Sequence, residues 1–356
     1  MKYKTGIFLI GMALWAGAAC SKAFPEDPPS PSFPYPVSAS TGTLCIRLEG
    51  ALSTKVANPS AETEKHCERW AFWLFDQAGD GVVYGCGGAG EEIRRTVLTG
   101  TYTAVAVANY PDALVPERVK RIEDVRDRVA LLSENAPGSL LMYGESPVEL
   151  EKDQTAEAAV EVRRLVAKVG VKKVSVAFES PYLASKETVL HGIYLTNVYR
   201  SARLGKDYSA AELSPSRDAW YNSMGWHLYG DTDSASDALL GETGLDTVLT
   251  PEAPLTTPHY FYAYPNSVPA DADIHEAEWA VRCTRLVLQV AVGNKVFYYQ
   301  IPVPEMERNK VYLAEEVVIK GLGSQDPEQE IPGAIDVVFT AGGQEWDDNY
   351  SVTEQS

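Results

Sequence analysis

Residues 158–177, AAVEVRRLVAKVGVKKVSVA, decide how the fold of this 356-residue chain is divided. Apolar residues alternate along this stretch, which predicts a long β-strand that is buried on one face. The alternation changes parity at Arg163-Arg164 and again at Lys172-Lys173. Because a one-residue slip moves every side chain of a strand to its opposite face, each basic pair predicts a bulge or bend. We therefore expect the seam between two β-domains here; a long edge strand with two bulges is the alternative.

The composition of the chain favours strands and argues against one class of partner. It contains 19 Tyr and 7 Trp, which are common in strands. Its formal net charge of −18 argues against binding to nucleic acid, which requires a basic face. A length of 356 residues predicts two domains. We expect a mainly β protein with two β-sandwich-like domains in tandem, residues 43–170 and 171–356.

The N-terminal segment is typical of an exported lipoprotein. Two lysines precede a short apolar run over residues 7–17, and Cys20 follows. This pattern predicts a signal peptide over residues 1–19, cleavage before Cys20 and acylation of that cysteine. An ordinary secretory signal followed by a chance cysteine is the alternative. Residues 20–42 are rich in proline and are expected to form an extended tether.

Four further cysteines bear on the redox chemistry of an exported protein, which can form disulfides. They are Cys45, Cys67, Cys86 and Cys283. Cys67 and Cys86 flank a hairpin-like segment and are the first pair to consider, although the sequence does not fix the connectivity. Their spacing is not that of a zinc site.

Other candidate sites lack part of the pattern that their chemistry requires. Residues 85–90 match GxGxxG, but a strand-like run rather than a helix follows, which argues against dinucleotide binding. Residues 231–242 partly match a calcium loop, without its required glycine. Because neither metal-ligand spacing nor a catalytic motif occurs, we expect no metal, no cofactor and no enzymatic activity. One polar stretch suggests glycan binding through its aromatic residues, with burial in the core as the alternative: Trp220, Tyr221, Trp226 and Tyr229.

Two segments near opposite ends of the chain share the same alternation of apolar side chains. TLCIRL, residues 43–48, predicts the first strand, and AIDVVFTA, residues 334–341, predicts a strand near the C-terminus. The side chains on one face of the first are Leu44, Ile46 and Leu48, and those on one face of the second are Ile335, Val337, Phe339 and Ala341. Between them, apolar residues three or four apart predict one helix over residues 116–134.

Several segments together resemble the fimbrillins, the type V pilins of anaerobic Gram-negative bacteria. The most specific are VFYYQIPV, residues 296–303, and MERNKVYLAEEVVIKGLGSQDPEQ, residues 306–329. LTGTYTAVAVANYPDAL, residues 98–114, is similar to a strand of the family's first domain, and EVRRLVAKV, residues 161–169, to the strand before its second. The C-terminal segment with Trp346 also fits. The resemblance implies two transthyretin-like β-sandwich domains.

The resemblance also implies a function in adhesion. Fimbrillins are structural subunits of fimbriae, or pili, and reach the outer membrane as lipoproteins, here with lipid (palmitate) on Cys20. A protease removes the first strand, here residues 43–49, and the emptied groove accepts a donor strand from the next subunit, here within residues 334–352. The implied partners are other copies of the chain or other fimbrial subunits, and a host glycoprotein or glycan.

The processing site is where this chain departs from the family. Fimbrillins carry the cleaved arginine in a loop after the first strand, whereas residues 50–66 contain no arginine and only Lys55 and Lys65 as lysines. Arg47 is inside the predicted strand, where a protease would reach it poorly. Cleavage by a different enzyme, cleavage at Arg47 in a loosened strand, and no cleavage are the alternatives. An uncleaved subunit would keep its lipid and act as an anchor or accessory subunit.

Overall fold

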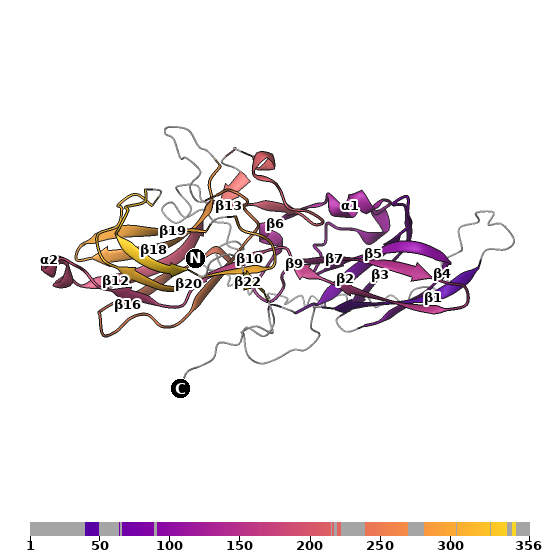
Figure 1. Ribbon diagram of the computed structural model, residues 1–356, viewed down its shortest axis with the longest axis horizontal. Helices are drawn as coiled ribbons and strands as arrows, with labels where there is room; N and C mark the ends of the chain where they lie inside the picture. Colours follow the sequence, from indigo (N-terminus) through magenta and orange to yellow (C-terminus); the bar gives the residue numbers. More distant parts are fainter. Residues whose placement is uncertain are drawn as a thin grey trace, which may run out of the picture. The chain divides into compact units, whose positions relative to one another are not determined.

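The computed structural model of the chain describes separate residue ranges between Ser40 and Trp346. These ranges are 40–49, 64, 66–88, 91–214, 216, 219–221, 239–269, 281–303, 305–327, 329–339 and 344–346. Strands dominate them, so the prediction of a mainly β fold with tandem β-sandwiches is confirmed (Figure 1). The signal peptide and Cys20 lie outside the described residues. The boundary at residue 170 stays a prediction.

The first half of the chain forms two sheets, with strand orders β4-β1-β8 and β3-β2-β5-β7-β9. Their strands are β1 (Thr41–Glu49), β2 (Arg69–Phe75), β3 (Gly81–Gly88), β4 (Ile93–Leu98), β5 (Gly100–Ala108), β7 (Met142–Leu150), β8 (Thr155–Glu161) and β9 (Arg163–Arg164). After the exposed Arg69, the remaining residues of β2 are all buried, and they alternate between two hydrophobic clusters. The larger sheet is therefore covered on both faces, which explains the continuous apolar run of β2.

The second half also contains two main sheets, with strand orders β11-β20-β10-β17 and β16-β12-β18-β19. Their strands are β10 (Ala167–Val171), β11 (Val174–Val176), β12 (Thr188–Thr196), β16 (Gly241–Val248), β17 (His259–Ala263), β18 (Thr284–Val292), β19 (Lys295–Val303) and β20 (Lys310–Ile319). Two late strands, β21 (Ile335–Phe339) and β22 (Gln344–Glu345), pair with β20. One hydrophobic cluster contains residues of both halves, from β2 to Trp346.

Short elements complete the described fold. They are η2 (Pro116–Arg118), α1 (Ile122–Arg126), β6 (Val129–Leu131), η3 (Leu132–Glu134), α2 (Pro181–Ala184), β13 (Val198–Tyr199), β14 (Ser201–Arg203), η4 (Ala210–Glu212) and β15 (Trp220–Tyr221). The pair β14-β6 hydrogen-bonds a strand of the second half to one of the first half.

The stretch 158–177 changes sheets at the first basic pair. β8 lies beside β1, β9 then pairs with β7 of the other sheet, and β10 continues into the second half of the chain. Val171 and Val174 are both buried although they are three residues apart, so the buried face of the strand changes at Lys172-Lys173. The strands on either side of this pair, β10 and β11, both pair with β20. The two basic pairs thus have different consequences. At the first the chain passes from one sheet to another, and at the second only the face of the strand that is buried changes.

The prediction of one helix over residues 116–134 is wrong. This stretch contains η2, α1, β6 and η3 in place of a continuous helix. Backbone groups that a helix would use internally are hydrogen-bonded elsewhere: Lys120 accepts from Gly81, and Ile122 donates to Gly79. Residues of β6 pair with β14. Tertiary hydrogen bonds to a turn and to a distant strand therefore override the helical period.

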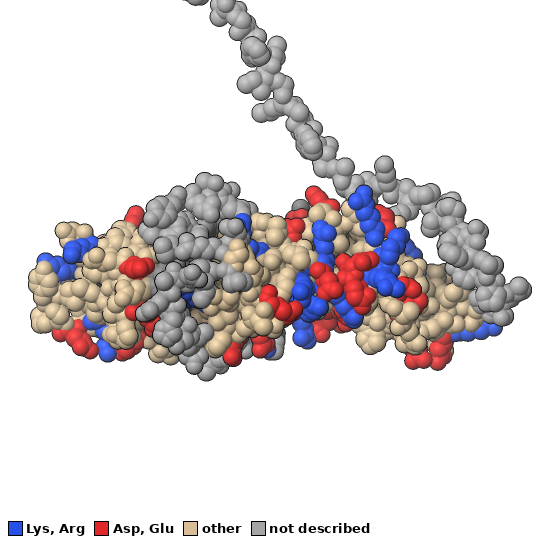
Figure 2. All heavy atoms as spheres, turned by 90° about the horizontal axis from the view of Figure 1, so that it is seen from above, with Lys and Arg blue, Asp and Glu red and all other residues tan. Residues whose placement is uncertain are grey.

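Charged side chains of both signs share the described surface. On the face shown in Figure 2, basic side chains lie among acidic ones and do not form a separate patch of the described residues. Several are joined as exposed ion pairs, for example Arg126 with Glu145 and Lys206 with Asp127. None of the helices among the described residues is both long and apolar enough to span a membrane.

Candidate functional site

β1 is the middle strand of its sheet. It pairs antiparallel with β4 from Thr41 to Ile46 and parallel with β8 from Thr43 to Glu49. Leu44 and Ile46 are fully buried, and Leu48 is partly buried against the same hydrophobic cluster. The structure thus brings the three residues expected to fill a groove into one core, between two strands that would remain if β1 were removed.

The candidate processing residues differ in what surrounds them. The Arg47 side chain is half exposed, and its guanidinium lies 3.4 Å from a carboxylate oxygen of Glu49 and 3.7 Å from one of Glu157. Its backbone belongs to β1 and pairs with Ala159 of β8. Lys55 and Lys65 lie outside the described residues. Arg47 therefore combines an exposed side chain with a backbone that is held inside a sheet.

β21 lies at a sheet edge and packs less tightly. It pairs antiparallel with β20, and Ile335, Val337 and Phe339 are partly buried against the core. Val338, on the opposite face, is 60% exposed. A cavity of about 310 Å³ lies between the inward-facing side chains of β21 and residues of β19 such as Tyr299. Ala341, the fourth predicted donor residue, lies outside the described residues.

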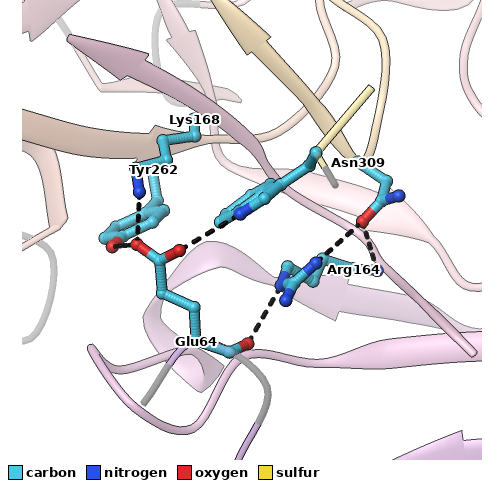
Figure 3. Close-up of polar contacts among 6 residues, drawn as sticks. Glu64, Arg164, Lys168, Tyr262 and Asn309 are labelled. Carbon is cyan, nitrogen blue, oxygen red and sulfur yellow. Dashed lines mark hydrogen bonds and ion pairs between the residues drawn. The ribbon is translucent and has the colours of Figure 1, made fainter. Parts of the chain in front are cut away.

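A buried polar cluster joins the connection after β1 to the end of the described chain (Figure 3). The Glu64 side chain is 8% exposed. Its carboxylate accepts hydrogen bonds from Lys168 Nζ at 2.7 Å and Tyr262 Oη at 2.5 Å. It also accepts one from Trp346 Nε1 at 3.1 Å. Burial, reinforced by the Glu64 carboxylate, raises the pKa of Tyr262, so its hydroxyl remains a donor.

Aromatic and cationic groups surround the Trp346 indole in this cluster. The Arg164 guanidinium carbon lies 4.4 Å from the ring centroid, and the Tyr262 ring stacks at 5.8 Å with an interplanar angle of 13°. Arg164 Nε also donates to the backbone carbonyl of Glu64 at 2.9 Å. We name Glu64, Arg164, Lys168, Tyr262 and Trp346 the Glu64 cluster.

The sequence pattern does not reveal the Glu64 cluster. Glu64 lies in a polar connection without a periodic pattern, so nothing marks it as buried. Lys168 gave the only usable signal, because it is a charged residue between the apolar Ala167 and Val169 of a strand. A lysine in such a place requires a partner when it is buried.

The structure does not support the proposed pairing of Cys67 with Cys86. None of the four described cysteines forms a disulfide. Cys67 lies in the cluster beneath β1, and its thiol donates to the Arg69 carbonyl, whereas Cys86 packs against the other cluster. Cys86 also pairs in register with Ala71, four residues beyond Cys67. In this structure the two cysteines are therefore associated with different cores and do not form the predicted pair. Burial raises the pKa of Cys67 to about 11.

The described residues of the other sequence candidates do not form a binding site. Trp220 and Tyr221, two of the four aromatic residues considered for glycan binding, are buried at 2% and 5% exposure. Trp226 and Tyr229 lie outside the described residues, as does most of the calcium-like stretch. Residues 85–88 belong to β3, and the next described element is strand β4. Within the described ranges, no three His, Cys, Asp or Glu side chains gather in a way that could hold a metal ion.

These features define a class of β protein with tandem sandwiches, a central first strand and a late strand at a sheet edge. A putative cell adhesion protein from Bacteroides eggerthii shares the fold at 19% identity, with a TM-score of 0.60, covering 87% of this chain and 97% of its own. Another, from Parabacteroides distasonis, shares it at 16% identity, with a TM-score of 0.58 and coverages of 87% and 98%.

A fimbrilin from Porphyromonas gingivalis shares the fold at 14% identity, with a TM-score of 0.53, covering 84% of this chain and 96% of its own. None of these three is described as an enzyme. No family model and no curated protein sequence matches the chain. This chain has the fold of fimbrial subunits and cell adhesion proteins, and the resemblance to the fimbrillins is confirmed at the level of fold.

Proposed function

We propose that this chain is a structural subunit of a cell-surface fimbria that mediates adhesion and assembles by strand exchange. The observation that carries the proposal is the position of β1, which is hydrogen-bonded on both sides and fills a core with Leu44 and Ile46. Its removal would leave two unpaired strand edges and an apolar groove. Such a groove accepts a strand from another molecule through ladder hydrogen bonds and alternate side chains.

β21 supplies a donor with the matching period. Ile335, Val337 and Phe339 face inward and lie two residues apart, as do Leu44, Ile46 and Leu48 of β1. Burying three such side chains at about 1.5–3 kcal/mol each would stabilise a subunit joint by several kcal/mol before the entropy of association is subtracted. The partners are therefore other copies of this chain or other fimbrial subunits.

The precursor is proposed to be an outer-membrane lipoprotein with its lipid on Cys20. In that form β1 stays in its groove, which covers the strand edges and prevents aggregation during export. Cleavage after β1, with Arg47, Lys55 and Lys65 as candidates, would release the lipid-bearing segment and make the groove available. Host glycoproteins or glycans are the proposed adhesion targets of the assembled fimbria.

The test compares two substitutions in adjacent residues of β21. Val337→Asp places a charge on the inward face and is expected to abolish SDS-resistant polymers on cells that make them. Val338→Asp adds the same charge on the face that is 60% exposed, and polymers are expected to persist. Equal loss of polymers in both variants, or in neither, would argue against β21 as the donor.

A second candidate function is a lipid-retained anchor or accessory subunit of the same fimbria. The observation that favours it is Arg47, whose backbone is paired within β1 instead of standing in an open loop. Sequencing the N-terminus of protein recovered from cell surfaces separates the two. A start between about residue 48 and residue 70 would indicate a polymerising subunit, and an acylated Cys20 on all recovered protein would indicate an anchor.

A further inference from the structure

The Glu64 cluster holds the segment that contains the proposed donor strand. Trp346 follows β21 by seven residues and is 7% exposed, although β21 itself lies loosely at a sheet edge beside a cavity. We propose that the Glu64 cluster is a latch that keeps the C-terminal segment on its own subunit and opens before that segment enters another. This inference rests on the proposed strand exchange.

Directed contacts make the cluster a specific site for the indole. The Glu64 carboxylate accepts from Trp346 Nε1 at 3.1 Å while Lys168 Nζ, at 2.7 Å, balances its charge. Hydrogen bonds to a charged acceptor are about twice as strong as neutral ones, and burial strengthens them further. A non-specific apolar contact would need neither group.

Aromatic ring contacts and a backbone hydrogen bond also hold Trp346. Arg164 and Tyr262 lie against the indole of Trp346, and the backbone N–H of Trp346 donates to the Asn309 carbonyl at 3.2 Å. A guanidinium on an aromatic face is attracted by the electrons of the ring, and more strongly where water is excluded. Among the described residues beyond β21, Trp346 is therefore the point at which the segment is held most firmly.

The position of Glu64 in the chain couples this latch to processing. Glu64 belongs to the connection between β1 and β2, in which cleavage is proposed. A cut before Glu64 leaves the carboxylate in place, whereas a cut after it removes the acceptor with the released segment. Lys168 and the Trp346 indole would then lose their common partner, and a buried donor without an acceptor is costly. The site of cleavage thus decides whether the donor segment is freed together with the groove.

Hydrogen exchange on the full-length chain tests the latch directly. Trp346→Ala removes the captured side chain and leaves Glu64 paired with Lys168 and Tyr262. We expect the amides of β21 and residues 344–346 to exchange on the order of 100-fold faster, while those of β1 keep their protection. Unchanged exchange in residues 335–346 would overturn the proposal.

A matched pair of lysine substitutions tests the same latch from the receiving side. Lys168→Ala removes the cation that balances buried Glu64, and Lys173→Ala removes an ion pair with Glu316 in which both side chains are over a third exposed. We expect faster exchange of residues 335–346 in the first variant only. Retained protection of β1 in both variants excludes general unfolding as the cause.

Polymer formation by the lysine variants distinguishes a failed latch from a failed function. Lys168 is not part of the donor segment, so the strand to be donated is unchanged. We expect processed Lys168→Ala protein to form polymers faster than processed Lys173→Ala protein. Equal rates would overturn the latch while strand exchange stands. If the unsubstituted processed protein forms no polymers, the proposed function fails instead, whatever the exchange data show.

Discussion

β1 and β21 share an alternating pattern but are held in opposite ways. β1 is hydrogen-bonded to β4 and β8, and Leu44 has no exposed surface. Among the described strands β21 pairs only with β20, and Val337 stays partly buried beside the cavity. The same sequence signal therefore corresponds to a central strand in one place and an edge strand in the other.

This difference is what an exchange reaction requires. If β1 is removed, a strand that takes its position can form backbone hydrogen bonds with a neighbouring strand on each side. A donor, in contrast, has to leave its own subunit at low cost, which an edge position allows. The proposed cleavage then supplies directionality, because it detaches the strand that would not leave by itself.

The largest effect is expected in the groove. Leu44→Ala removes a fully buried side chain from the core beneath β1 and should lower the free energy of unfolding by about 2–5 kcal/mol. Urea denaturation of the full-length precursor measures this change. A loss of less than about 1 kcal/mol would mean that β1 is not firmly held, and the comparison would fail at its first step.

A smaller effect is expected at the edge. Val337→Ala should lower the free energy of unfolding by about 1 kcal/mol, because the side chain is only partly buried and already borders a cavity. The same urea titration gives the value. A loss as large as that of Leu44→Ala would show that both strands are equally fixed, and β21 would be a poor donor.

The sequence predicted those features that depend on short-range periodicity. The alternation around Leu44 and around Val337 located both strands, and the parity change at Arg163-Arg164 located the passage between sheets. These signals are local, because a strand that is buried on one face must alternate. The pattern did not reveal that one strand is central and the other peripheral, since pairing partners come from distant parts of the chain.

The features that depend on distant contacts were missed or misread. The helical period of residues 116–134 was overridden when β6 paired with β14. Cys67 and Cys86 are close enough in sequence to suggest a pair, yet they pack against different cores. The Glu64 cluster joins residues up to 282 positions apart. No local pattern encodes such a contact, so only the folded chain could show it.

The smallest effect on stability, and the sharpest test of processing, concerns Arg47. Its ion pairs with Glu49 and Glu157 are exposed, so Arg47→Gln should change the free energy of unfolding by less than about 1 kcal/mol. We also expect the N-terminus of the mature surface protein to stay the same. Cleavage at Arg47 requires its backbone to leave β8, and the residues before it, up to Ile46, are paired with β4 as well. Such openings are rare for a strand that is held on two sides.

Lys55→Gln and Lys65→Gln are the matched variants for that measurement, because they remove the only two lysines of residues 50–66. If either one shifts the mature N-terminus while Arg47→Gln does not, the protease acts outside the sheet and β1 is removed whole. If Arg47→Gln alone blocks processing, β1 opens far more readily than its two ladders suggest. β1 and β21 would then differ in which of them is cleaved, and not in how firmly each is held.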